Sequence, residues 1–320
     1  MKDVAALAGV SISTISRYLN GRADRMSKET AAKIKIAIDK LNYVPNLAAR
    51  QMITKSSSMV AVMVANIDDY FSTELFKGAS SILESNGYIG MLFDSDSSLA
   101  REQQLLKAVD NHMFDGLLLQ PLTNDVQTIS SEMRRQIPVT LVDRELALSP
   151  WPEVVTDNYE AARQATNFFI NEGFKHIIIL SSTVKNNSTR KERLDGITSI
   201  TDNYDLIEVP DQSYNHYEVQ KKITNLIKKA TEKTLIFGLR ESLLLEYIAP
   251  LMMNGDIDRI NVTVTGFSDT RLLRAIDPPL KMLNQNPFLM GAVAAEILIN
   301  MLTGNKTDQK DKVVIHAKLK

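Results

Sequence analysis

The sequence contains no cysteine, one tryptophan and four histidines in 320 residues. Without cysteine there is neither a disulfide framework nor a thiolate metal site. The histidines, His112, His176, His216 and His316, lack metal-ligand spacing, so we expect no metal site. The sequence also has no apolar run long enough to span a membrane and no signal-peptide pattern. We therefore expect a cytoplasmic protein that does not bind membranes.

The common catalytic motifs are absent as well. The sequence has no phosphate-binding G-x-x-x-x-G-K-[ST], no G-x-G-x-x-G, no H-E-x-x-H and no G-x-S-x-G. The adjacent carboxylates Asp68 and Asp69 are typical of a solvated turn rather than of a paired-carboxylate site. We therefore expect neither enzymatic activity nor a cofactor.

Positive charge is concentrated at the start of the chain. Residues 1–55 hold ten Lys or Arg and four Asp or Glu, a net charge of +6, whereas the whole chain carries −1 and residues 56–320 therefore carry −7. A basic module attached to an acidic body is typical of proteins that bind the phosphate backbone of DNA.

The segment from Lys2 to Asn20 has the pattern of a helix-turn-helix. Val4, Leu7 and Ala8 recur at helical spacing before Gly9, and Ile15 and Leu19 form a second small apolar face. Short or hydrogen-bonding side chains face outward on the second helix, among them Ile12, Ser13, Ser16 and Arg17. By itself this segment also fits a small amphipathic hairpin.

A third helix is predicted from Lys28 to Leu41, with Ser27 as its N-cap, because Ala31, Ile34, Ile38 and Leu41 recur at helical spacing. Residues 46–58 begin as a short helix and end in a polar run, which indicates a hinge and linker. The apolar Leu47 and Met52 have three candidate destinations: the equivalent helix of a dimer partner, the minor groove of DNA, or the body of the protein.

Separate motifs are spread over nearly the whole chain. These are KDVAALAGVS (2–11), SRYLN (16–20), LNYVPN (41–46), VDRE (142–145), DNYEAA (157–162), ERLDG (192–196), GFSD (266–269), DPPL (277–280) and QNPFLMG (285–291). In these motifs and in their order, the chain resembles bacterial transcription regulators of the lactose-repressor/galactose-repressor (LacI/GalR) family.

Strand and helix patterns alternate in the body, which predicts parallel sheets with helices on both faces. Expected strands are 60–64, 89–93, 116–120, 139–142, 176–180, 234–237 and 261–265, and expected helices include 73–85, 99–111, 159–172 and 289–302. The alternation therefore predicts an α/β fold class for the body, after an all-α helix-turn-helix head. The family resemblance implies that the body is like that of periplasmic binding proteins and is made of two α/β subdomains.

The resemblance implies a domain plan. Residues 1–45 would form the DNA-binding domain, 46–58 the hinge helix and linker, and 59–320 the effector-binding and dimerisation domain. Within the body, residues 59–156 and 287–304 would form the first subdomain, and 157–286 and 305–320 the second. The chain would cross between them near Asp157, Asn286 and Asn305.

The family's contacts, carried over by position, give two sites. The DNA-binding set is Ile12, Ser13, Thr14, Ser16, Arg17, Asn20, Asn46, Ala49 and Met52. The effector-binding set is Tyr70, Phe71, Asn187, Thr189, Arg193, Phe237, Arg240 and Ser268. Aromatic rings suit stacking on a sugar, and Thr, Asn and Arg supply directed hydrogen bonds.

Two departures from the family pattern concern the effector's charge. Arg240 stands where the family commonly has a polar amide, and Ser268 where it commonly has Asp. Both changes make the cleft more positive, which favours an anionic effector such as a sugar acid or sugar phosphate. The alternative is that Arg240 pairs internally with Glu241 or Asp269 and that the effector is a neutral sugar.

The sequence therefore predicts a homodimeric transcription regulator, a repressor in the family's usual mode, that binds a palindromic operator in double-stranded DNA under control of an effector. A periplasmic sugar-binding protein is the rival interpretation, because the body alone would fit it. The basic head argues against that rival.

Overall fold

The structure is a computed structural model that describes residues 1–19, 26–44, 56–112, 114–185, 187–211, 215–268, 270–305 and 312–320. The chain divides into two compact units, the head (residues 1–57) and the body (residues 58–320).

Three helices form the head: α1 (Lys2–Ala8), α2 (Ile12–Leu19) and α3 (Lys28–Lys40). α1 ends at Gly9, whose φ of 66° lies in the left-handed region that glycine adopts without strain. The hydroxyl of Ser27 accepts a hydrogen bond from the Thr30 nitrogen at 3.1 Å and caps α3, as predicted. The three helices meet in one apolar core of Val4, Ala5, Ala8, Ile15, Ile34 and Ala37. Leu7, by contrast, is exposed.

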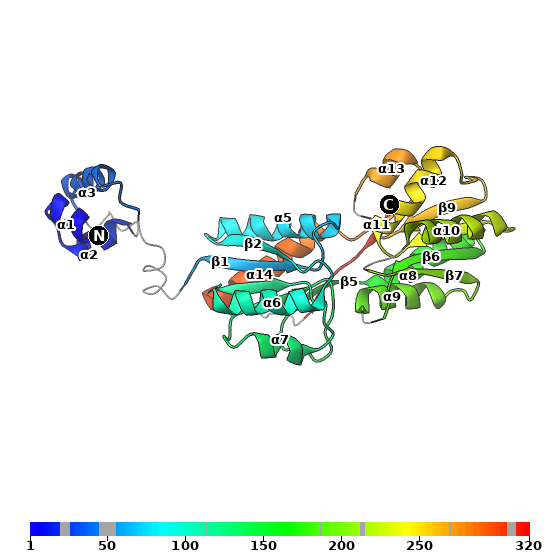
Figure 1. Ribbon diagram of the computed structural model, residues 1–320, viewed down its shortest axis with the longest axis horizontal. Coiled ribbons are helices and arrows are strands. Elements are labelled where there is room, and N and C mark those ends of the chain that lie inside the picture. The colour runs from blue at the N-terminus through cyan, green and yellow to red at the C-terminus, as the bar shows by residue number, and fades with distance from the viewer. Residues whose placement is uncertain are drawn as a thin grey trace. The chain divides into compact units, whose positions relative to one another are not determined.

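The first subdomain of the body is a six-stranded parallel sheet in the order β11-β5-β4-β3-β1-β2. Its strands are β1 (Met59–Val64), β2 (Ile89–Asp94), β3 (Gly116–Leu119), β4 (Val139–Val142), β5 (Glu153–Thr156) and β11 (Lys312–Ile315). Its helices are α5 (Tyr70–Ser85), α6 (Leu99–Asn111), α7 (Val126–Glu132) and α14 (Pro287–Thr303), and they cover both faces of the sheet (Figure 1).

The side chains of β1 alternate between the two faces of the sheet, and those on both faces are apolar and covered by helices. Val60, Val62 and Val64 pack toward α5 and α14, whereas Ala61 and Met63 pack toward α6 and α7. All five side chains are fully buried. Such an unbroken apolar run is typical of a parallel strand that is buried on both sides.

α5 and α14 approach one another very closely at two glycines. A Cβ at Gly78 would lie 1.9 Å from the Phe288 carbonyl oxygen, and one at Gly291 would lie 1.9 Å from the Leu75 carbonyl oxygen. Both contacts are with backbone, so neither position accepts a side chain unless the helices separate. These two glycines set the distance between the helices.

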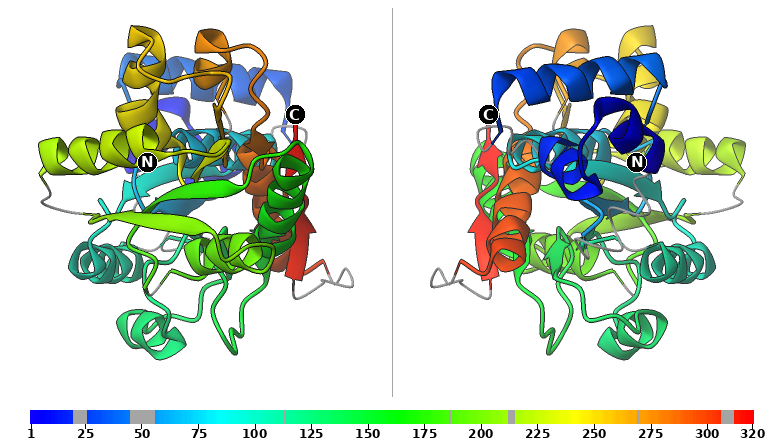
Figure 2. Two further views of the ribbon diagram at one scale, coloured as in Figure 1. Left: turned by 90° about the vertical axis from the view of Figure 1, so that its right-hand side faces the viewer. Right: turned by 90° about the vertical axis from the view of Figure 1, so that its left-hand side faces the viewer.

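The second subdomain has a four-stranded parallel sheet in the order β7-β6-β8-β9. Its strands are β6 (His176–Ser182), β7 (Tyr204–Val209), β8 (Thr234–Gly238) and β9 (Val262–Gly266). One face packs on α8 (Asn158–Asn171) and α9 (Ser188–Thr198). The other packs on α10 (His216–Lys229), α11 (Glu241–Leu243), the π-helix η2 (Leu244–Ile248), α12 (Ala249–Asn254) and α13 (Leu272–Ile276). Helices on both sides of this sheet are visible in Figure 2.

Three segments connect the subdomains. They pass through Asp157, through Gln285 and Asn286, and through His316 and Ala317. After the third segment, β12 (Lys318–Leu319) pairs antiparallel with β10 (Leu283–Asn284).

One predicted boundary is corrected. Residues 305–320 were assigned to the second subdomain with a crossing near Asn305, but β11 pairs in parallel with β5 in the first subdomain. The physical reason is apolar packing, because Val313 and Ile315 contact the core of the first subdomain. The third crossing therefore lies after Ile315.

The predicted α/β fold class with parallel sheets is confirmed. Each of the seven predicted strands is present within two residues at either end, and the helix at 99–111 has the predicted bounds. The strands β5, β7, β10, β11 and β12, the helices α7 and α9 to α13, and the π-helix η2 were not among those named from the sequence. Within the described residues, no helix is long and apolar enough to cross a membrane.

Candidate functional site

The outward face of α2 carries several of the side chains predicted to contact DNA. Arg17 is exposed, and Ile12 is 45% exposed although it is apolar. The hydroxyls of Ser13 and Thr14 lie 2.7 and 2.9 Å from the hydroxyl of Ser11, which also accepts a hydrogen bond from the Thr14 nitrogen. Ser11 thus organises the start of α2, a role that the sequence analysis missed. Ser16 is half-buried.

The remaining predicted DNA contacts, Asn20, Asn46, Ala49 and Met52, lie outside the described residues, as does most of the predicted hinge.

A cleft separates the two subdomains at the carboxyl ends of their strands, where ligands bind in parallel α/β folds. Its lining from the first subdomain is Ala65, Asn66, Asp69, Phe71, Ser72, Ser97, Gln120, Asp143 and Arg144. Its lining from the second subdomain and the connecting segment is Asn187, Thr189, Arg190, Arg193, Leu239, Arg240, Glu241, Phe267 and Gln285.

Five of the eight predicted effector contacts line this cleft: Phe71, Asn187, Thr189, Arg193 and Arg240. The other three do not. Tyr70 begins α5 and is 41% exposed outside the lining. Phe237 is fully buried in the core that packs β8 on α8 and α9, and it pairs with Thr265, two residues before the lining residue Phe267. Ser268 is buried, and its hydroxyl donates to Glu241 at 2.6 Å.

Phe267, which the sequence analysis did not select, supplies the aromatic surface instead of Phe237. Its ring lies 3.7 Å from the guanidinium carbon of Arg193. Arg193 is buried and also donates from Nε to Asn158 at 2.9 Å and from Nη1 to the Leu239 carbonyl at 2.6 Å. A guanidinium stacked on a ring and held from two sides keeps a fixed orientation.

Arg240 pairs internally, but with partners other than those considered from the sequence. Its Nε lies 3.3 Å from Oδ2 of Asp69, and its Nη1 lies 3.7 Å from Oδ1 of Asp211 and 3.4 Å from the hydroxyl of Ser182. Glu241 instead accepts hydrogen bonds from Ser268 and from the Thr270 backbone and hydroxyl. Asp269 lies outside the described residues.

Two further arginines line the cleft and were not predicted. Arg190 forms a bidentate pair with Asp211 at 2.8 and 2.9 Å. Arg144 donates from Nη1 to the Pro121 carbonyl at 3.0 Å, while its buried Nε finds no hydrogen-bond acceptor among the described residues. Burial lowers the pKa of Arg144, and the carboxylate of Asp143 raises it.

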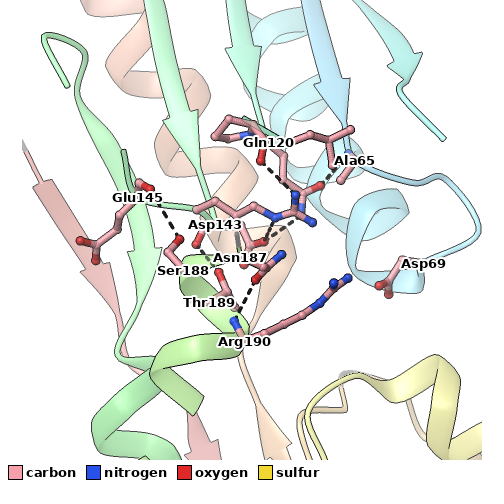
Figure 3. Close-up of polar contacts among 12 residues, drawn as sticks. Ala65, Asp69, Gln120, Asp143, Glu145, Asn187, Ser188, Thr189 and Arg190 are labelled. Atoms are coloured by element: carbon pink, nitrogen blue, oxygen red, sulfur yellow. Dashed lines mark hydrogen bonds and ion pairs between the residues drawn. The ribbon is translucent and has the colours of Figure 1, made fainter. Parts of the chain in front are cut away.

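The side-chain amide of Gln120 connects three loops that line the cleft. Its side-chain oxygen accepts from the Ala65 nitrogen at 2.9 Å, and its nitrogen donates to Oδ2 of Asp143 at 2.8 Å (Figure 3). Asp143 has a φ of 69°, a backbone conformation that non-glycine residues seldom adopt. The amide therefore ties the loops after β1, β3 and β4 together at a strained position.

Hydroxyl groups of α9 reach across to the first subdomain. Thr189 donates to the carbonyl of Asp143 at 3.2 Å, and Ser188 donates to the carbonyl of Glu145 at 3.5 Å (Figure 3). At the start of the same helix, Asn187 accepts a hydrogen bond from the Arg190 nitrogen at 2.8 Å and caps the helix. α9 thus contributes both lining side chains and contacts between the subdomains.

The cleft lining carries charges of both signs. Four arginines line it, Arg144, Arg190, Arg193 and Arg240, against three carboxylates, Asp69, Asp143 and Glu241, and a fourth carboxylate, Asp211, pairs with Arg190 and Arg240. No group of three or more His, Asp or Glu able to hold a metal ion lies together in the part of the chain that the structure describes.

Comparison with known families and proteins gives concordant matches. Residues 1–46 match the family described as "Bacterial regulatory proteins, lacI family", and residues 60–306 match "Periplasmic binding protein domain". The chain is 28% identical over 311 residues to the HTH-type transcriptional regulator KdgR of Bacillus subtilis, covering 96% of this chain and 92% of that protein.

Two solved structures extend the comparison. A LacI transcriptional regulator from Lactobacillus brevis is 48% identical with a TM-score of 0.78, covering 82% of this chain and 100% of the other. The lac repressor dimer bound to operator and the anti-inducer ONPF has a TM-score of 0.82 at 19% identity, covering 99% of this chain and 96% of the other. At that identity the second match concerns the fold alone.

Proposed function

The chain belongs to the lacI family of bacterial regulatory proteins, and we propose that its DNA affinity is controlled by an anionic sugar derivative bound in the cleft of the body. As a member of this family it is a DNA-binding transcription regulator with a periplasmic-binding-protein-like effector domain. The lacI-family match at residues 1–46 disfavours the rival interpretation as a periplasmic sugar-binding protein.

At the DNA end, we propose that α2 enters the major groove and presents Arg17, Ile12 and Ser13 to the bases. The exposure of Arg17 and Ile12 supports this placement. The hydroxyl of Ser13 already contacts Ser11, so Ser13 is the weaker candidate for base contact. Residues 46–58 would act as the hinge, with Met52 inserted into the minor groove, and two heads of a cytoplasmic dimer would bind the two halves of a palindrome.

Dimerisation through the body is supported by an exposed apolar edge. β2 is an edge strand of its sheet, and Ile89 and Met91 on it are 63% and 41% exposed. Sedimentation should show a dimer for the native chain and a monomer for Ile89→Lys. A native monomer would contradict the dimer.

The main observation in favour of an anionic effector is that the contacts of Arg240 with its neighbours are long. Its contacts at 3.3, 3.4 and 3.7 Å are longer than the bidentate pair of Arg190 with Asp211 at 2.8 and 2.9 Å. Charge-assisted hydrogen bonds have lengths of about 2.7–2.9 Å, so a carboxylate or phosphate would satisfy Arg240 better than its present neighbours do.

A neutral sugar is the second candidate, and one observation favours it. Asp69 and Asp211 already offset the charge of Arg240, while Asp143 and Glu241 offer acceptors for sugar hydroxyls. An anionic effector requires the positive charge of Arg240, whereas a neutral sugar does not.

The test is a thermal-shift screen against neutral sugars, sugar acids and sugar phosphates, followed by calorimetry with Arg240→Ala. The proposal predicts that the tightest ligand is an acid or phosphate and that Arg240→Ala weakens it about tenfold or more. The control, Arg134→Ala, removes the same charge from an exposed site outside the cleft lining and should leave the affinity unchanged. Tightest binding by a neutral sugar, unaffected by Arg240→Ala, would overturn the anionic effector.

A further inference from the structure

An ion pair joins the two walls of the cleft. Asp69 lies in the loop between β1 and α5 of the first subdomain, and Arg240 is the second residue after β8 in the second. Oδ2 of Asp69 lies 3.3 Å from Nε of Arg240, and the two side chains are 24% and 21% exposed. Figure 3 shows Asp69 at the start of α5, across the cleft from the α9 residues Thr189 and Arg190.

This pair ends a row of side chains that alternate in charge, and Asp69 is the member of the row that a ligand anion would displace. Arg190 holds Asp211 through two short hydrogen bonds, Asp211 contacts Arg240 at 3.7 Å, and Arg240 contacts Asp69 through one nitrogen. A single-nitrogen contact of 3.3 Å leaves unused most of what a guanidinium offers to a carboxylate. A ligand carboxylate that binds in bidentate fashion would therefore compete well with Asp69.

We propose that Asp69 occupies, in the unliganded protein, the position at Arg240 that the effector's anionic group takes, and that this internal pair holds the cleft closed. The competition with the effector depends on the anionic effector proposed above, whereas the closing contact between the subdomains does not. Asp69 would then be a residue that sets effector affinity by competing for Arg240 rather than by binding the effector.

Asp69 also makes a second contact, which is structural, and a substitution can keep that contact while it removes the charge. Oδ1 accepts a hydrogen bond from the Phe71 nitrogen at 3.2 Å, so Asp69 is also the N-cap of α5. Asparagine is as good an N-cap as aspartate. Asp69→Asn therefore keeps the cap and removes the charge that faces Arg240. Asp68→Asn is the matched control, because it makes the same change one residue away, at an exposed side chain outside the cleft lining.

The closing contact is tested by distance measurements between spin labels in the unliganded full chain. The native sequence has no cysteine, so Gln104→Cys on α6 and Asn225→Cys on α10, both exposed, supply the two labelled positions. Mixing labelled chain with a tenfold excess of unlabelled chain ensures that almost every dimer containing label has only one labelled protomer.

We expect Asp69→Asn to shift the distance distribution toward open forms by about two- to fivefold in population, the range for a partly exposed ion pair. Arg240→Gln should give the same shift, and the double variant should give no further one. The Asp68→Asn distribution should match that of the native chain. A native-like distribution for Asp69→Asn would overturn the closing contact.

The competition is tested separately by calorimetry with D-gluconate and D-glucose 6-phosphate. We expect Asp69→Asn, and not Asp68→Asn, to bind whichever probe binds the native chain about two- to fivefold more tightly. Unchanged or weaker binding by Asp69→Asn would overturn the competition. If Asp69→Asn opens the cleft while sugar acids and sugar phosphates bind neither protein, the anionic effector fails and the closing contact stands.

Discussion

Asp157 holds together two of the three segments that connect the subdomains. Its Oδ1 accepts a hydrogen bond from the Ala317 nitrogen at 2.8 Å, and its Oδ2 lies 2.8 Å from Nδ1 of His316. The remaining segment is attached beside it, because Gln285 donates to the hydroxyl of Thr156 at 3.3 Å. Any movement of one subdomain on the other must bend the backbone at these residues.

We expect Asp157→Ala to lower the free energy of unfolding of the body by about 1–2 kcal/mol, because the Ala317 nitrogen loses its acceptor. Asp157→Asn keeps an oxygen for that nitrogen and should cost less. Urea unfolding at pH 7 followed by circular dichroism measures both variants. Equal losses for Ala and Asn would mean that the charge, and not the hydrogen bond to Ala317, is what matters.

The stacked Arg193 gives a second prediction. Lysine at this position would lose the planar group that lies on Phe267 and donates to both Asn158 and Leu239. We expect Arg193→Lys to lower the free energy of unfolding by about 1–3 kcal/mol and to weaken the ligand found by thermal shift. Arg163→Lys, at an exposed pair with Glu160 on α8, is the control and should change stability by less than about 0.5 kcal/mol. Similar losses at both positions would contradict a special role for the stacked arginine.

A buried carboxyl makes the body's stability depend on pH. Glu102 is fully buried on α6 and accepts hydrogen bonds from the Leu122 and Thr123 nitrogens at 2.6 and 3.3 Å. Burial raises the pKa of Glu102 above its ordinary 4.5, although both hydrogen bonds and Arg144 act to lower it. A carboxyl with a raised folded-state pKa contributes stability below its ordinary pKa, and that contribution is lost as pH rises through the folded-state pKa.

We therefore expect Glu102→Gln to gain stability relative to the native chain as pH rises from about 4 to about 7. Urea unfolding at four pH values across that range gives the difference in free energy, and the fixed cost of the substitution cancels from the trend. A difference that does not change with pH would show that burial of Glu102 does not affect its titration.

The head offers a test that leaves the body untouched. Ile34 is fully buried among the three helices, whereas Ile36 on the same helix is 65% exposed. We expect Ile34→Ala to destabilise the head by about 2–4 kcal/mol and to abolish DNA binding, while ligand binding by the body continues. Ile36→Ala should change neither. Retained DNA binding by Ile34→Ala would contradict the assignment of this core to the DNA-binding unit.

Sequence periodicity predicted many of the strands and helices that have strong apolar patterns, although α10, with Val219 and Ile223 buried one turn apart, was not named. β1 reads as an unbroken apolar run because both faces of its sheet are covered, and α6 has its buried residues at helical spacing. α9 was missed as a helix because Ser188–Thr198 is mostly polar, although it carries two of the predicted effector contacts. Of its buried residues, Thr189 and Arg193 line the cleft and only Ile197 belongs to the apolar core, so the helix shows no apolar periodicity.

The cleft lining depends on where each strand ends and on partners far apart in sequence. Phe237 and Phe267 lie on the same face of their sheet, and only the pairing of Phe237 with Thr265 shows that Phe267 lies two positions closer to the cleft. Likewise, Asp69 and Arg240 are separated by 171 residues, and the sequence does not show that they meet. The third subdomain crossing was misplaced because β11 is short and returns to the first sheet.

The central claim, that the basic head binds DNA through its phosphates as part of a dimer, is tested most directly by salt dependence. A palindrome selected from random DNA is titrated with the full chain at several salt concentrations, and the binding constant is followed by fluorescence anisotropy. For a dimer that contacts about ten phosphates, we expect a plot of the logarithm of the binding constant against the logarithm of the salt concentration to have a slope of about −9. A slope near zero would contradict the account.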